Sequence, residues 1–322
     1  MTQDQALIAR LYQSMLLIRE LEQHIVDVYH TDAVKSPVHL SIGQESVAVG
    51  VCDPLNSDDI VSNTYRCHAT YLAKGGDING MMAELYGKKH GCAGGKAGSM
   101  HLVDIKHGIL GASAVVGTTI PIAAGYAFAL QQEAKKTGKQ RIVASLFGDG
   151  ATEEGVFTET INFAMLKKLP IIFICENNQL AIHSPLRSRW ASEHICERVA
   201  SFGIRTHQVK NADIFELHQL ISKEAENIRN GISGPVFIEC ETYRWLEHVG
   251  PGDDHHEEYR DPNELALWKN KDQIARLANM LAPHEKEKIN QKVAALIKNA
   301  VAFAEQSPYP DEEELFTHVY AN

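Results

Sequence analysis

Residues 141–182 read RIVASLFGDGATEEGVFTETINFAMLKKLPIIFICENNQLAI. Residues 141–147 and 171–175 are apolar runs of strand length. Between them, residues 154–168 carry apolar side chains at helical spacing, and Leu169-Pro170 ends the predicted helix. A strand–helix–strand unit of this length predicts a parallel, right-handed crossover, which brings the polar turns after both strands to the same edge of a sheet.

The two polar turns predict a site for a divalent cation and a diphosphate. The first turn is Gly148-Asp149-Gly150, and Asn178 lies in the second. Glycines let phosphate oxygens approach backbone N–H groups, while Mg²⁺ would bridge the phosphates to the oxygens of Asp149 and Asn178. Two alternatives are a generic dinucleotide-binding turn, whose third glycine would fall where Glu153 stands, and asparagines that only cap a loop.

The rest of the chain continues the alternation of strands and helices, which predicts an α/β fold with a mostly parallel sheet. We expect a single domain over residues 1–322, with an N-terminal helix at 3–30, an α/β core at about 36–260 and C-terminal helices at 262–281 and 284–305. Further strands are predicted at residues 59–62, 205–209 and 236–241.

Composition excludes several classes of protein. The formal net charge of −10 argues against a nucleic-acid or anionic-membrane partner, and no apolar stretch approaches the length of a membrane span. The first ten residues lack the order of a secretory signal. Six scattered cysteines without a Cys-x-x-Cys pair are typical of reduced residues, so we expect a cytoplasmic protein.

The segment GDGATEEGVFTETINFAMLKKLPIIFICENN closely resembles the α subunit of the first, decarboxylating component of 2-oxo acid dehydrogenase complexes. That family includes the pyruvate, acetoin and branched-chain enzymes, and the resemblance extends from about residue 10 to about residue 300. It implies a three-layer α/β/α fold and the cofactors thiamine diphosphate and Mg²⁺.

The resemblance implies roles for the residues of the two turns. The side chains of Asp149 and Asn178 and the backbone carbonyl of Leu180 are expected to bind Mg²⁺. Gly150 and Ala151 are expected to contact the cofactor.

Other cofactor residues are expected on three loops. Tyr65-Arg66-x-His68 is similar to the family's Tyr-Arg-x-His, so Tyr65 and Arg66 are expected to contact the diphosphate, and His68 to border the active site as a catalytic residue. By resemblance, backbone groups of Gly108 and Leu110 hold the aminopyrimidine ring. A plain loop before the helix at residues 120–132 would explain that last segment almost as well.

His248 falls on a histidine of the family's active-site loop, and its pKa range suits proton transfer. The chain departs from pyruvate-type relatives at Pro37, where an aromatic residue lines their cofactor pocket. A serine that is sometimes phosphorylated follows the histidine in the family, and Val249 stands there in this chain.

The resemblance implies oxidative decarboxylation of a 2-oxo acid and transfer of the acyl group to lipoamide on an acyltransferase component. The glutamate that activates thiamine belongs to a β subunit in two-subunit relatives, so an α2β2 heterotetramer is expected. Acetoin cleavage, a thiamine-dependent lyase or ligase, and a non-catalytic scaffold subunit stay open as alternatives.

Overall fold

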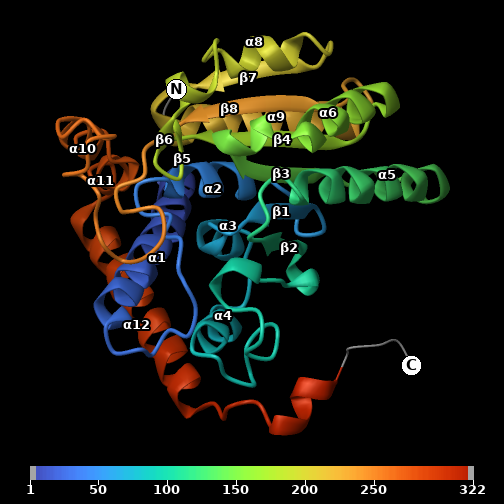
Figure 1. Ribbon diagram of the computed structural model, residues 1–322. Helices are drawn as coiled ribbons and strands as arrows, with labels where there is room; N and C mark the ends of the chain where they lie inside the picture. The colour runs from blue at the N-terminus through green and yellow to red at the C-terminus, as the bar shows by residue number, and fades with distance from the viewer. Residues whose placement is uncertain (1–4, 318–322) are drawn as a thin grey trace.

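A six-stranded sheet forms the centre of the computed structural model, which describes residues 5–317 (Figure 1). Each strand of this sheet is parallel to its neighbours, so the predicted α/β class with a mostly parallel sheet is confirmed. Across the sheet the strands are β2 (Ile109–Ser113), β1 (Ile60–Thr64), β3 (Val143–Gly148), β4 (Ile171–Asn177), β8 (Val236–Glu241) and β7 (Arg205–Val209).

The order of the strands creates a crevice between β1 and β3. From β1 the chain adds β2 on one side, whereas β3 lies on the other side and is followed outward by β4. The connections that leave the carboxyl ends of β1 and β3 therefore diverge, and such a reversal is where open α/β sheets bind ligands. Tyr65 follows β1, and Asp149 follows β3, so the topology brings both predicted site residues to this crevice.

Helices cover both faces of the sheet and make three layers. Along β4, Phe173 belongs to one apolar core while Ile172 and Ile174 belong to the other, because successive side chains of a strand point to opposite faces. The first core is shared with α5 (Thr119–Thr137), α6 (Gly155–Lys167) and α8 (Ile195–Ala200). The second is shared with α1 (Gln5–Tyr29), α2 (Glu45–Cys52), α3 (His68–Ala73), α4 (Ile78–Leu85), α9 (Ile214–Arg229) and α12 (Pro283–Gln306).

The strand–helix–strand unit predicted at residues 141–175 is present as β3, α6 and β4. The two strands pair in parallel from Val143↔Ile171 to Gly148↔Glu176. Lys168 ends α6 in the left-handed region at φ 51°, and Pro170 then begins the approach to β4. Strand β4 is buried along its whole length, which explains why its sequence is a continuous apolar run.

Two parts of the prediction are wrong. No strand is predicted from the sequence at residues 109–113, but Ile109–Ser113 form the edge strand β2, because Val61 N–H donates to the carbonyl of Gly108 at 2.8 Å and Ile109 is buried. The helix predicted at 262–281 is divided into α10 (Glu264–Lys269) and α11 (Gln273–Ala278), because Asp272 accepts a hydrogen bond from Ile274 N–H and starts a new helix.

The remaining elements are short, and several of them lie beside the carboxyl edge of the sheet. Residues 3 and 4 of the predicted N-terminal helix lie outside the described range. Among residues 5–317, no helix is long and apolar enough to cross a membrane, and no cysteine is paired. The short helices and strands not yet described are η1 (Ser99–His101), η2 (Ile105–His107), η3 (Asp149–Glu153), β5 (Leu180–Ala181), β6 (Ser184–Pro185), α7 (Leu186–Arg189), η4 (Lys210–Ala212) and η5 (Glu312–Phe316).

Candidate cofactor and metal site

A cavity of about 270 Å³ opens at the carboxyl ends of β1, β3 and β4. Eight of the eleven site residues predicted from the sequence line it, although they come from four separate segments of the chain. These eight are Tyr65, Arg66, Asp149, Gly150, Ala151, Asn178, Leu180 and His248.

Asp149 places a carboxylate in the wall of this cavity. Its side chain is 1% exposed, and its Oδ2 accepts a hydrogen bond from the guanidinium of Arg189. Its Oδ1 is buried without a hydrogen-bond partner. Burial raises the pKa of Asp149, and the positive charge of Arg189 opposes this shift. A buried carboxylate oxygen without a partner is costly, and a bound cation would satisfy it.

Asn178 and Leu180 bring two further oxygens to the same wall. The side-chain amide of Asn178 is oriented because its Nδ2 donates to Gln44 Oε1 at 2.9 Å, while its Oδ1 accepts from Leu180 N–H at 3.1 Å. Gln179, between them, adopts φ 64°, which turns the chain sharply after β4. One carboxylate, one amide oxygen and one backbone carbonyl form a hard-oxygen donor set that fits Mg²⁺ shared with phosphate oxygens.

This donor set differs from a metal cage built by the protein alone. Among residues 5–317, no group of three or more His, Cys, Asp or Glu side chains could hold a metal ion. The remaining coordination positions would therefore have to come from a ligand or from water, as is usual for Mg²⁺.

Arg66 supplies a buried positive charge on the β1 side of the cavity. Its side chain is 7% exposed and donates hydrogen bonds to the backbone carbonyls of Leu40 and His248. Both acceptors are uncharged, so they orient the guanidinium without neutralising it. Burial lowers the pKa of Arg66 to about 10, which leaves the group charged near neutral pH and suited to a diphosphate.

Glu176 is a second buried carboxyl group in the cavity wall. It follows Cys175 at the end of β4 and was not predicted as a site residue. Burial raises the pKa of Glu176 to about 7, and the charge of Arg66 opposes that shift.

Three aromatic rings form a cluster beside Arg66. The ring centroids of His39 and Tyr65 lie 4.4 Å apart, and those of His39 and His248 lie 5.1 Å apart. Burial, reinforced by the charge of Arg66, lowers the pKa of both histidines to about 3. Both imidazoles are therefore neutral near pH 7 and can accept a hydrogen bond. The expectation from the sequence that the pKa of His248 suits proton transfer is wrong for this structure, because burial makes the ring a weak proton acceptor.

The sequence prediction missed Gln44, which lines the cavity, and His39, whose ring packs on the lining residues Tyr65 and His248. Neither residue lies after a predicted strand, so the strand pattern gives no signal for them. The adjacent Glu45, whose carboxylate pairs with Arg19 and accepts from Gly43 N–H, holds this loop at the start of α2.

Three predicted residues lie outside the cavity wall. His68 is fully buried, with its Nε2 2.7 Å from Ser99 Oγ and its Nδ1 3.2 Å from Glu22 Oε1. The carbonyl of Gly108 is used by the sheet, and Leu110 is a half-buried residue of β2. The roles of these three residues stay predictions.

Comparisons with known proteins identify the family of this chain. A family model described as the dehydrogenase E1 component matches residues 13–313. The alpha subunit of acetoin:2,6-dichlorophenolindophenol oxidoreductase from Bacillus subtilis is 37% identical over 316 residues, which cover 97% of this chain and 93% of that protein.

Two further relatives are pyruvate dehydrogenase E1 component alpha subunits. The protein from Porphyra purpurea is 37% identical over 321 residues, covering 97% of this chain and 92% of its own length. A chloroplastic protein from Arabidopsis thaliana is 35% identical over 320 residues, covering 97% of this chain and 74% of its own length. The family predicted from the sequence is therefore confirmed, and the chain belongs to the dehydrogenase E1 component family.

Proposed function

We propose that this chain is the α subunit of a thiamine-diphosphate-dependent 2-oxo acid dehydrogenase of the pyruvate type. The observation that carries the proposal is that two buried groups of opposite charge line the same cavity. Asp149 presents a carboxylate oxygen without a partner, and Arg66 presents a guanidinium bound to neutral carbonyls. A magnesium diphosphate offers a cation to the first and an anion to the second.

The described residues fit both the metal and the cofactor. Asp149, Asn178 and the carbonyl of Leu180 would hold Mg²⁺, and Arg66 with Tyr65 would hold the diphosphate. When bound, the thiazolium ring of thiamine diphosphate supplies the electron sink that decarboxylation of a 2-oxo acid requires. The protein contributes orientation and the buried charges of Asp149 and Arg66, which interact more strongly than charges in water.

His248 would accept a hydrogen bond beside the reacting groups. Its neutral imidazole lines the cavity and lies against Tyr65, and His39 packs on both rings. Because the pKa of His248 is lowered to about 3, the ring stays neutral near pH 7 and does not repel Arg66. We assign to His248 a catalytic role as a neutral hydrogen-bond acceptor.

The working enzyme is proposed to be an α2β2 heterotetramer. The relatives described above are named as alpha subunits, and the β subunit would supply the glutamate that activates thiamine. A lipoyl-bearing acyltransferase component would then accept the acyl group. If the chain purified alone had full 2-oxo acid decarboxylase activity, the need for a β subunit would be contradicted.

Acetoin is the second candidate substrate. The Bacillus subtilis acetoin enzyme subunit and the Porphyra purpurea pyruvate enzyme subunit are equally similar to this chain, at 37% identity. A panel of pyruvate, branched-chain 2-oxo acids and acetoin, assayed with the co-expressed β subunit and an artificial electron acceptor, separates these possibilities. The substrate with the highest kcat/KM identifies the activity.

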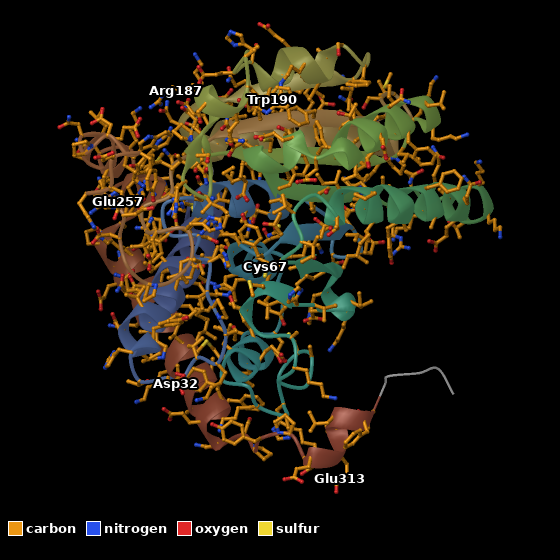
Figure 2. All side chains as sticks on the ribbon, in the orientation of Figure 1. Asp32, Cys67, Arg187, Trp190, Glu257 and Glu313 are labelled. Carbon is orange, nitrogen blue, oxygen red and sulfur yellow. The ribbon has the colours of Figure 1, made fainter. Side chains whose placement is uncertain are left out.

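The cofactor assignment is tested by calorimetry on the assembled complex. Thiamine diphosphate should bind in the presence of Mg²⁺, and Asp149→Asn should abolish this binding because it removes the metal-binding charge. Asp32→Asn is a matched control, since Asp32 is exposed just after α1 and is not among the residues that line the cavity (Figure 2). If the wild-type complex bound no thiamine diphosphate, a non-catalytic scaffold would be the better assignment.

A further inference from the structure

Arg189 connects the loop after β4 to the turn after β3. It is the last residue of α7, and its side chain is only 10% exposed. Its guanidinium forms ion pairs with Asp149 and with Glu153, which lie at the two ends of η3. A planar guanidinium can bind two carboxylates at once in a fixed geometry, and a lysine ammonium is less suited to this task.

The ion pair uses only one oxygen of Asp149. Arg189 binds Oδ2, and Oδ1 is left buried and without a partner. A carboxylate that binds a metal through one oxygen is commonly oriented by a hydrogen bond to the other. The arrangement at Asp149 is therefore that of a metal ligand whose direction is already set.

The same loop carries the backbone carbonyl of Leu180 and is held in an unfavourable conformation. Gln179 and Ile182 have φ values of 64° and 54°, in the left-handed region that residues with a side chain seldom adopt. For Ile182 this is a genuine outlier, because its side chain is branched at Cβ. Such a loop requires contacts that keep it against the turn, and Arg189 provides one of them.

We propose that Arg189 is a positioning residue for the metal site, which orients Asp149 and fastens the Leu180 loop to the same turn before the metal binds. The inference rests on the proposed function, because it assumes that Asp149 and Leu180 share a divalent cation. It adds a residue that touches neither the metal nor the cofactor and acts through both ligand-bearing segments.

Arg189 would weaken metal binding, instead of supporting it, if its guanidinium occupied the position of the cation. In that case metal binding would require Arg189 to leave Asp149, and removing Arg189 would strengthen metal binding. The free Oδ1 favours positioning, because the metal and Arg189 can then use different oxygens.

The test measures Mn²⁺ affinity by electron paramagnetic resonance in the assembled complex, with thiamine diphosphate present. Arg189→Gln should weaken Mn²⁺ binding by about 10- to 100-fold, the range typical of lost partners of metal ligands. Arg189→Lys should restore part of the affinity, because it keeps the charge but loses the fork. Arg187→Gln is the matched control, since Arg187 is exposed on the same short helix (Figure 2).

A second readout separates positioning from general loss of stability. In the metal-free complex, Arg189→Gln should speed hydrogen exchange at backbone amides of residues 179–190, while the exchange of amides in β3 and β4 stays at the wild-type rate. Faster exchange in those central strands as well would mean that the variant loosens the whole fold, and would overturn the positioning role.

Three further outcomes are decisive. Equal Mn²⁺ affinity of Arg189→Gln and wild type would overturn the inference and leave the proposed function intact. Tighter binding by Arg189→Gln would overturn it in favour of competition between Arg189 and the metal. If the wild-type complex bound no Mn²⁺ with thiamine diphosphate, the proposed function would fail and this inference would fail with it.

Discussion

A single methyl group added at Gly150 should displace the backbone that carries one of the proposed metal ligands. An ideal Cβ at this position lies 2.9 Å from Ala181 Cβ, whereas carbon atoms in contact are about 3.5–4.0 Å apart. Gly150→Ala therefore forces a separation of roughly 0.6–1.1 Å. The side chain of Ala181 is itself a methyl group and cannot rotate away, so the backbone of β5 must move and must carry the carbonyl of Leu180 with it.

The expected loss follows from the size of this displacement. Misplacement of a site by about 1 Å can cost roughly 10²-fold in rate, so kcat/KM of the assembled enzyme should fall by about that factor. Overpacking of this kind also costs about 1–3 kcal/mol of stability when it occurs in a core, and less should be lost at this partly exposed turn. Mn²⁺ affinity in the presence of thiamine diphosphate should fall together with the rate.

The assay compares Gly150→Ala with Gly155→Ala. Gly155 begins α6, and a Cβ added there would meet no heavy atom within 4 Å. The control should therefore keep wild-type Mn²⁺ affinity and kcat/KM. If the two variants bound Mn²⁺ equally well, β5 would not need its observed place against the turn, and the reasoning about the Leu180 ligand would be refuted.

Three other predictions concern stability and cofactor binding. Because burial lowers the pKa of His39 to about 3, the unfolded chain binds an extra proton at this residue below about pH 6.5, and His39 alone should lower the free energy of unfolding by about 2–3 kcal/mol at most between pH 7 and pH 4.5. His39→Gln should reduce the loss measured by urea unfolding at the two pH values by about this amount, while the contribution of His248, whose pKa is lowered in the same way, should remain. A loss equal to that of the wild type would contradict the burial argument. Gly43→Ala should lower Tm by several degrees more than Gly75→Ala. Both glycines have positive φ, but only a Cβ added at Gly43 would clash, because it would lie 2.2 Å from Trp245 Cδ1. Equal Tm values would show that the Trp245 side chain moves freely. Arg66→Lys should raise the Kd of thiamine diphosphate at least about 10-fold. A lysine ammonium cannot replace a planar guanidinium that donates to two backbone carbonyls and would also bind a diphosphate. An unchanged Kd in calorimetry would contradict the proposal that Arg66 binds the diphosphate.

The sequence was sufficient to predict the central unit and the position of Asp149 and Asn178 at one edge of the sheet. Strands β3 and β4 are buried apolar runs bounded by turns, so local pattern alone locates both Asp149 and Asn178. The parallel crossover then requires their turns to share one edge of the sheet. No long-range information beyond chain topology was needed for this step.

The edge strand and the second half of the site were harder to predict. Strand β2 is only five residues long, contains Gly111 and buries Ile109 alone, so its sequence lacks a strand pattern. His39 joins the site only through ring contacts with Tyr65 and His248, which line the cavity and are distant from His39 in sequence. Likewise, no sequence spacing relates Arg189 to Asp149, because the intervening loop folds back through two residues with positive φ.

The burial of the Arg66 charge lowers the stability of the protein when no anion is bound. Its guanidinium joins the carbonyls of Leu40 and His248, segments separated by some two hundred residues in the chain, while its charge is withdrawn from water. An anion in the cavity would relieve that unfavourable desolvation at the moment it binds, so occupancy and folding are thermodynamically linked. Arg66 thus favours anion binding but lowers the stability of the protein when no anion is bound. A neutral side chain at position 66 would stabilise the fold and weaken anion binding.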